Sequence, residues 1–230
     1  MKCSAIVTGG TGGLGAAVVA RLLDDGWRVV VPWIVEEELA RIEQREGLEL
    51  IEADLFDPAA AAQVVAAAVA DEGTPLRGLV NLVGGFAVGG RVHETPIEEF
   101  EKQLRLNLRA TYLMTQAAVP PMLENGGGSI VCVGTRAAFQ PFRGAVGYVA
   151  SKAAVMASAQ AVAAEYRDDG IRCNAIVPSV IDTPANRASM PNADQSRWVK
   201  PEAIAGVVAF LLSSDSEPVS GAAVPVYGRA

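Results

Sequence analysis

A glycine-rich turn near the start of the chain constrains the fold more than any other feature. The segment Thr8–Gly15 contains five glycines, and it lies between an apolar run, Ser4–Val7, and a helical pattern, Ala16–Leu23. Glycine lets the backbone turn sharply and approach a diphosphate group closely. The N–H groups at the start of the following helix then face the anion. A strand, a turn and a helix in this order predict a nucleotide-binding α/β fold.

Seven short apolar runs alternate with longer segments of helical pattern. Continuous apolar runs are typical of strands that are buried on both faces, as in a parallel sheet. Repeated strand–helix–strand units predict a single doubly wound Rossmann-type α/β domain over residues 1–230, with about seven parallel strands and helices on both faces. The runs are Ser4–Val7, Arg28–Val31, Leu48–Ile51, Leu79–Val83, Ile130–Val133, Ile171–Val177 and Ala222–Val226.

One long helix is predicted in the middle of the chain. Thr95 reads as an N-cap, Pro96 as the first helical residue and Glu98 as a capping-box partner. A helix that begins there runs to about Ala118. It ends before the pair Pro120–Pro121, because proline has no backbone N–H to donate.

Three other segments carry local helix signals. Lys200–Glu202 opens a helix that ends near Leu212, and the alanine-rich segment Ala59–Ala70 favours a helix with no chemical role. The acidic run Glu36–Glu38 is interpreted as the solvated start of a helix rather than as part of a functional site.

Composition narrows the function classes. Half of the residues are apolar and 20% are charged, which is typical of a globular protein. A net charge of −7 disfavours nucleic acid and anionic lipid as partners. No apolar stretch reaches the roughly 18 residues of a membrane span, so no membrane partner is expected.

Cysteine and histidine usage carries a second set of expectations. Cys3, Cys132 and Cys173 form no CxxC pair, so we interpret them as buried, reduced thiols. Met1–Val7 is too short for a secretory apolar region, and a reducing cytoplasm is the expected location. His93 is the only histidine, which leaves no basis for a metal site or a histidine-based triad and places His93 in a surface loop.

Tyr148 and Lys152 form the first candidate for catalysis. A spacing of four residues places both side chains on one face if the segment is helical. An ammonium near a phenol favours the phenolate and lowers the pKa of the tyrosine. A tyrosine tuned in this way can donate a proton to a forming alkoxide or accept one from an alcohol.

The TGxxxGxG pattern of Gly9, Gly13 and Gly15, combined with this tyrosine–lysine pair, resembles the short-chain dehydrogenase/reductase family. The family's further elements occur in order from Ser4 to Tyr227, which is essentially the whole chain.

The resemblance implies hydride transfer between a nicotinamide cofactor and a carbonyl or alcohol substrate. It implies that Tyr148 is the acid/base, that Lys152 lowers the pKa of Tyr148 and binds the nicotinamide ribose, and that Asn107 supports a proton relay. Thr135 takes the place of the family's serine, and its hydroxyl would orient the substrate oxygen.

The cofactor-binding residues follow from the same resemblance. Asn81 and Gly84 match the family's NNAG element, Asp54 resembles the aspartate that reaches the adenine, and Asn174–Pro184 resembles the segment that holds the nicotinamide carboxamide. The full set is Thr8, Gly9, Thr11, Gly12, Gly13, Leu14, Gly15, Trp33, Asp54, Leu55, Asn81, Val83, Gly84, Tyr148, Lys152, Pro178, Val180, Ile181 and Thr183.

The choice between NAD and NADP stays open at this point. An acidic residue at the end of the second strand selects NAD, and a basic residue accommodates the 2′-phosphate of NADP. Trp33 takes that position, and the glycine turn contains neither Arg nor Lys. Two interpretations of Trp33 stand side by side: it stacks on the adenine, or it packs at the rim of the pocket.

The substrate is predicted only as a class. Residues 184–200 fit the family's variable lid, and Arg136, Phe139, Phe142 and Arg143 are candidate pocket residues. A ketone or a 3-oxoacyl-type carbonyl compound is expected. Gly134–Phe139 and Val83–Phe86 resemble the dihydropteridine reductases locally, so a pteridine-type substrate is one alternative, and a non-catalytic NAD(P)-binding sensor is another.

The resemblance also implies a homo-oligomer. The helices that carry Asn107 and Tyr148 would pair across a dimer, and Val219–Ala230 would contribute to a tetramer. The tail departs from the family's usual ending, so dimer and tetramer both stay open.

Overall fold

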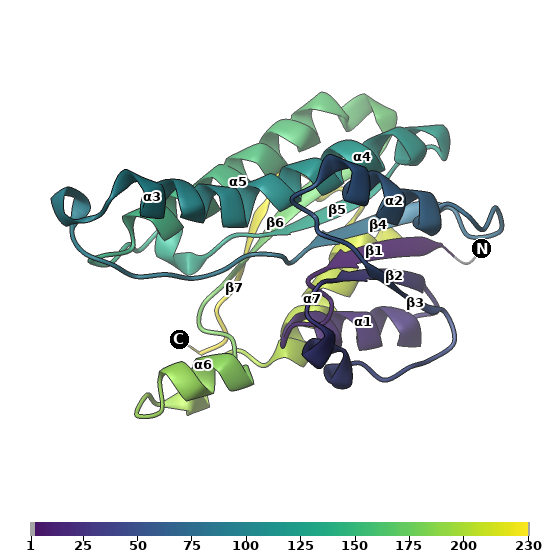
Figure 1. The fold of residues 1–230 in the computed structure, drawn as a ribbon. Coiled ribbons are helices and arrows are strands. Elements are labelled where there is room, and N and C mark those ends of the chain that lie inside the picture. Colours follow the sequence, from purple (N-terminus) through teal and green to yellow (C-terminus); the bar gives the residue numbers. More distant parts are fainter. Residues whose placement is uncertain (1–2, 230) are drawn as a thin grey trace.

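The computed structural model describes residues 3–229 and places one seven-stranded parallel sheet between two layers of helices (Figure 1). The strand order is β3-β2-β1-β4-β5-β6-β7, which confirms the doubly wound α/β fold that the sequence predicts. Met1, Lys2 and Ala230 belong to the predicted domain but lie outside the described residues. The strands are β1 (Ser4–Thr8), β2 (Arg28–Trp33), β3 (Leu48–Glu52), β4 (Leu76–Asn81), β5 (Gly128–Val133), β6 (Ile171–Pro178) and β7 (Ala223–Val226).

Side chains of the central strands alternate between two separate hydrophobic cores. Ile6 of β1 belongs to one core, whereas its neighbours Ala5 and Val7 belong to the other. Val131 of β5 and Leu79 of β4 likewise lie on opposite faces. Because both faces are buried, each strand must be apolar at successive positions, which explains the continuous apolar runs.

The helices form two layers and an outer group. α1 (Gly15–Asp24) and α7 (Pro201–Leu212) cover one face, and α2 (Pro58–Ala68), α4 (Ala110–Glu124) and α5 (Val146–Glu165) cover the other (Figure 1). α3 (Ile97–Leu104) and α6 (Pro184–Ser189) extend beyond the carboxyl ends of the strands. Among the described residues, no helix has both the length and the apolar character that crossing a membrane requires.

The sheet changes winding direction between β1 and β4. β1 pairs with β2 on one side and with β4 on the other, so the connections that leave β1 and β4 diverge. In a doubly wound sheet, ligands bind outside the carboxyl ends of the strands at this point. The glycine turn follows β1 directly, at the same place.

The helix predicted from Thr95 to Ala118 differs from the observed one at both ends. Thr95 does not cap it, because its hydroxyl donates to the carbonyls of Gly90 and Arg91 and leaves Pro96 as the first flanking residue. At the other end α4 continues through Pro120 and Pro121 to Glu124. Core packing of α4 side chains on both sides of the prolines outweighs the lost backbone hydrogen bonds.

A second interruption lies inside this helical stretch. A π-helical segment, Arg105–Arg109, separates α3 from α4 and contains Asn107. Single π turns inside α-helices often occur at functional sites, because the extra residue redirects a side chain.

The predicted burial holds for two of the three cysteines. Cys132 and Cys173 are buried on neighbouring strands, whereas Cys3 is partly exposed because β1 begins only one residue later. His93 has a 68% exposed side chain in the loop before α3, as predicted.

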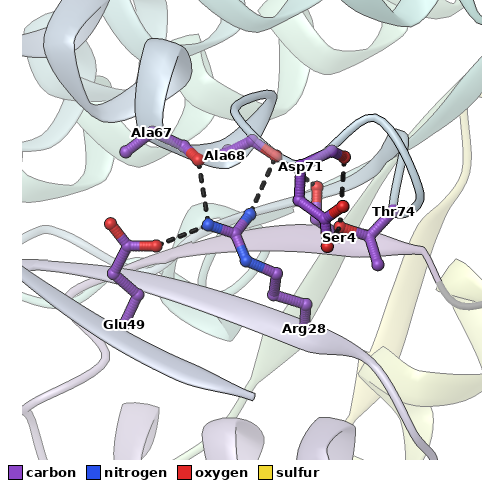
Figure 2. Close-up of polar contacts among 7 residues, drawn as sticks. All are labelled: Ser4, Arg28, Glu49, Ala67, Ala68, Asp71 and Thr74. Carbon is purple, nitrogen blue, oxygen red and sulfur yellow. Dashed lines mark hydrogen bonds and ion pairs between the residues drawn. The ribbon is translucent and has the colours of Figure 1, made fainter.

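Arg28 links the opposite, amino edge of the sheet to α2 (Figure 2). Its guanidinium donates to the carbonyl oxygens of Ala67 and Ala68 at 3.0 and 3.1 Å and pairs with Glu49. Ser4 Oγ donates to the same Ala68 oxygen at 2.8 Å. The last carbonyl groups of a helix have no partner inside the helix, so Arg28 and Ser4 satisfy the end of α2 from two strands.

We expect Arg28→Met to lower the free energy of unfolding by about 1–3 kcal/mol, because it keeps the apolar stem but removes one of the donors to each of two helix-terminal carbonyls and the cation that pairs with Glu49. Urea unfolding followed by circular dichroism measures the change. Arg45→Met is the matched control, since Arg45 pairs with Asp24 at the surface, and its unfolding midpoint should not move. Equal losses in both variants would contradict the role given to Arg28.

Candidate active site

The glycine turn closes tightly between β1 and α1. Gly9 has a φ of +65°, and a Cβ on Gly15 would lie 2.0 Å from the Gly9 carbonyl oxygen, so neither position accommodates a side chain. α1 begins with no side-chain cap and no acidic residue in its first turn. A Cβ on Gly13 would lie 3.0 Å from Thr183 Cγ2, so Thr183 faces the turn from across the sheet edge. The turn, the uncapped helix and Thr183 form a cradle that fits a diphosphate.

Thr8 joins the ends of the two strands at the switch point. Its Oγ1 accepts from the backbone N–H groups of Leu82 and Val83 at 3.1 and 3.4 Å. Asn81 does not face the same edge, because its side chain is buried and donates to Thr115 Oγ1 and Cys132 Sγ. The predicted site residues Thr8 and Val83 therefore lie together, whereas the Asn81 side chain is directed between β4, β5 and α4.

Trp33 and Asp54 lie on neighbouring strand ends. Trp33 is the last residue of β2, is partly exposed, and its carbonyl accepts from Ala53 N at 2.9 Å. Asp54 follows β3 and is exposed, with Oδ1 accepting from Phe56 N at 3.0 Å. Leu55, the next residue after Asp54, is buried. Both exposed side chains are open to a ligand at this side of the glycine turn.

The segment after β6 connects the sheet to α6. Val180 O accepts from Val199 N at 3.0 Å, and Ile181 O accepts from Asn186 Nδ2 at 2.8 Å. Thr183 Oγ1 caps α6 by accepting from Asn186 N. Residues from Pro178 to Thr183 are thus held in one conformation beside the glycine turn, on the side where the predicted lid begins.

Tyr148 is in the first turn of α5, with Lys152 one turn later, as the spacing predicts. The Tyr148 ring meets the edge of Phe86 with centroids 4.9 Å apart. Burial raises the pKa of Tyr148, and a hydrogen bond with Thr135 partly offsets that increase. Thr135 is itself buried after β5, so the two hydroxyls form one pair at the carboxyl edge of the sheet.

Lys152 is buried and its Nζ donates to the Val133 carbonyl at 3.1 Å. Burial lowers the pKa of Lys152 to about 8. The lowering of the Tyr148 pKa by Lys152 stays a prediction, because desolvation is the larger effect at Tyr148 and raises its pKa. Near neutral pH the tyrosine therefore carries its proton.

Asn107 is completely buried in the π-helical segment, where its side chain has four hydrogen bonds. Nδ2 donates to the carbonyls of Gly85 and Gln103 and to Ser151 Oγ at 3.0–3.2 Å, and Oδ1 accepts from Gly85 N at 3.0 Å. These bonds fasten α3 to α5 and to the loop after β4. Asn107 therefore fixes the position of the turn that carries Lys152.

Gly84 lies between Asn107 and Lys152. A Cβ at this position would be 2.6 Å from Asn107 Oδ1 and 2.9 Å from Lys152 Nζ. Only glycine fits there, so the loop after β4 passes directly over both polar groups.

Two cavities lie at the start of α5, and Tyr148 lines one of them. One of about 230 Å³ is lined by Tyr148 itself together with Val88, Phe100 and Gln103. The other, of about 310 Å³, is lined by residues 90–92, 141–146 and 149, which include Phe142 and Arg143. Arg136 points elsewhere, with its guanidinium 5.0 Å from the centroid of the Tyr227 ring, and Phe139 is exposed.

Sequence reasoning missed three residues of this region. Ser151 is a polar residue next to Lys152 in the sequence, and Phe86, which the sequence names only as the end of the segment Val83–Phe86, contacts the Tyr148 ring. A 3₁₀ segment begins at Glu36, where the acidic run predicts the solvated start of a helix, but Glu38 is only partly exposed and its Oε2 accepts from Thr11 Oγ1 at 2.8 Å. Nothing local signals that contact, since 27 residues separate the two side chains.

The fold and the site together define a dinucleotide-binding oxidoreductase that has a tyrosine–lysine pair. Residues 9–228 match the family model described as enoyl-(acyl carrier protein) reductase. The 2-(R)-hydroxypropyl-CoM dehydrogenase of Xanthobacter autotrophicus is 33% identical over 99% of this chain and 98% of its own length. Dehydrogenase/reductase SDR family member 4 of Oryctolagus cuniculus is 34% identical over 98% and 92%, respectively.

A solved structure agrees with these relatives. That of a blue fluorescent protein from a metagenomic library, in complex with NADPH, has a TM-score of 0.86 at 31% identity and covers 99% of this chain and 97% of its own. The chain belongs to the short-chain dehydrogenase/reductase family. It is an NAD(P)-dependent oxidoreductase that acts on alcohol and carbonyl groups. Within residues 3–229 no group of His, Cys, Asp and Glu side chains is arranged to hold a metal ion.

Burial of the Lys152 ammonium makes this residue costly for stability. We expect Lys152→Met to raise the free energy of unfolding at pH 7 by roughly 1–3 kcal/mol. The variant no longer buries a charge, and this gain exceeds the cost of leaving the Val133 carbonyl without its donor. The pKa of Lys152 is about 8 in the folded state, against an ordinary value of 10.5. Between pH 8 and 10.5 the lysine is therefore protonated in the unfolded wild-type chain and largely neutral in the folded one. Wild-type stability should therefore rise relative to the variant from pH 8 to 10.5, closing the gap.

Denaturant unfolding of both proteins from pH 6.5 to 10.5 tests this expectation, since other groups that titrate cancel in the difference. A variant that is less stable than wild type at every pH, by a constant amount, would show that the ammonium is not held at a cost.

Proposed function

We propose that Tyr148 is the acid/base of an NAD(P)(H)-dependent carbonyl reductase or alcohol dehydrogenase, acting with Lys152, Thr135 and Asn107. The observation that carries this proposal is the position of Tyr148, which lines a cavity of about 230 Å³ and lies one helical turn before the buried Lys152. A ketone or 3-oxoacyl-type substrate fits cavities with apolar walls beside a proton donor.

The nicotinamide ring, when bound, supplies or accepts the hydride. In the reducing direction the substrate carbon gains that hydride and its oxygen takes the proton from Tyr148 Oη. The raised pKa of Tyr148 keeps this proton in place near neutral pH. The Thr135 hydroxyl holds the substrate oxygen beside Tyr148, and its buried position restricts the approach to one side.

Lys152 and Asn107 would restore the proton. The backbone of Gly84 passes beside both Asn107 Oδ1 and Lys152 Nζ, where a side chain would collide with the two groups. With a pKa of about 8, Lys152 can give up and regain a proton near physiological pH. Asn107 acts as a positioning residue, since its four hydrogen bonds fix the helix turn under the lysine.

The cofactor would extend across the carboxyl ends of the strands. Residues of the glycine turn (Thr11, Gly12, Gly13, Leu14) would hold its diphosphate, and Trp33, Asp54 and Leu55 would border the adenosine. Pro178, Val180, Ile181 and Thr183 would border the nicotinamide, and residues 184–200 would form a lid over the substrate. In this proposal the cofactor site, the lid and the substrate cavity all belong to one domain.

We expect Tyr148→Phe to lower kcat by about 10²- to 10⁴-fold, because the variant has no proton to donate, while the Kd of the reduced cofactor changes less than about threefold. A panel of ketones and 3-oxoacyl compounds, assayed by nicotinamide absorbance, supplies the substrate, and cofactor fluorescence supplies the Kd. Tyr166→Phe is the control, since Tyr166 lies at the opposite end of α5 from Tyr148, and its kcat should match wild type.

An unchanged kcat in Tyr148→Phe would refute the role of this tyrosine. Cofactor binding without turnover of any compound, pteridines included, would instead favour the non-catalytic sensor that the sequence also allows.

A homo-oligomer in the cytoplasm is the final part of the proposal. Tyr112 and Leu123 are exposed on α4, next to the helix that carries Tyr148, which supports a dimer through this face. Sedimentation equilibrium should return a multiple of the 23.9 kDa chain mass, and a monomer at micromolar concentration would contradict it.

A further inference from the structure

The adenosine side of the cradle contains a carboxylate that is not at the end of the second strand. β2 ends at Trp33, which carries no charge, and the glycine turn holds no basic residue. A short 3₁₀ segment, Glu36–Arg41, follows and folds back toward the turn. It brings Glu38 against Thr11, the central residue of the turn.

Three contacts hold Glu38 in place. Its Oε2 accepts from Thr11 Oγ1 at 2.8 Å, and its Oε1 pairs with Arg41 Nη1 at 2.9 Å. Arg41 Nη1 also reaches the Thr11 carbonyl oxygen at 3.4 Å. Thr11 is only 4% exposed, whereas the Glu38 side chain is 32% exposed. The Glu38 carboxylate is therefore held by Thr11 on its buried side and accessible to a ligand on its solvent side.

The open side of Glu38 suits a diol. An ionised carboxylate has about four acceptor positions, and the two contacts of its oxygens occupy two of them. The ribose of a dinucleotide bound at a glycine turn lies between that turn and the end of the second strand. The 2′- and 3′-hydroxyls of that ribose are donors that Glu38 can accept.

The same place is unfavourable for a phosphate. Glu36, Glu37 and Glu38 oppose a single cation in this segment, Arg41, which leaves a formal local charge of −2. Arg41 is already paired with Glu38. A 2′-phosphate would bring further negative charge within the screening length of about 8–10 Å and compete with Glu38 for the one arginine.

We propose that Glu38, held by Thr11 and Arg41, selects NAD(H) over NADP(H) in this chain by accepting the ribose hydroxyls and repelling the 2′-phosphate. The inference rests on the proposed cofactor site at the glycine turn. The discrimination between NAD and NADP, which the uncharged Trp33 at the end of β2 leaves open, is thereby assigned to Glu38, five positions later.

Fluorescence titration of the purified full chain with NADH and with NADPH tests the inference without any substrate. Wild type should bind NADH at least about tenfold more tightly than NADPH. Glu38→Gln keeps the size of the side chain and removes its charge, so it should weaken NADH, strengthen NADPH and narrow the ratio of the two Kd values by about fivefold or more. Glu37→Gln is the matched control, because it removes the same charge from an exposed neighbour, and its ratio should change less than about twofold.

Three outcomes would overturn the inference. NADPH binding as tight as NADH in wild type would do so, as would equal effects of Glu38→Gln and Glu37→Gln. If wild type preferred NADPH and Arg41→Met lost that preference, the segment Glu36–Arg41 would be assigned to phosphate binding instead. Each of these leaves the proposed function standing, whereas the absence of binding by either nucleotide to the folded chain would remove the cofactor site itself.

Discussion

The close return of the chain between β1 and α1 is the constraint on which the rest of the structure depends. Gly15 lies so near the Gly9 carbonyl that a methyl group could not separate them, and this contact aims the start of α1 at the carboxyl edge of the sheet. Thr8, directly before the turn, bonds to the start of the loop after β4. The turn, the helix end and that loop therefore form one rigid unit at the switch point, and every candidate cofactor contact is placed relative to it.

The catalytic side of the site trades stability for chemistry. The Lys152 ammonium, the Asn107 amide and the Thr135 hydroxyl are buried near the carboxyl edge of the sheet, close to the partly buried Tyr148. Asn107 satisfies its own groups fully, but Lys152 has one carbonyl acceptor and a pKa that burial lowers to about 8. The environment that makes Lys152 expensive also makes it able to exchange a proton, and it keeps the proton of Tyr148 in place.

At Thr135 and Glu38 this chain places a functional group of the family on a different residue. Thr135 keeps the hydroxyl that the family's serine supplies and bonds to Tyr148 with it. Glu38 reaches the adenosine side from a 3₁₀ segment rather than from a strand end. In both cases the chemical group is preserved while the residue that carries it changes.

The sequence by itself determined the architecture and the main candidates. Strands buried on both faces must be continuously apolar, so the seven runs located all seven strands, and the glycine spacing and the Tyr148–Lys152 spacing are local properties that survive folding. Tertiary structure alone decided what depends on distant neighbours. Core packing carries α4 through Pro120 and Pro121, burial raises the pKa of Tyr148, and the Asn81 side chain is directed inward. The contact of Glu38 with Thr11 joins residues far apart in the chain, and no local pattern encodes desolvation or a contact at that range.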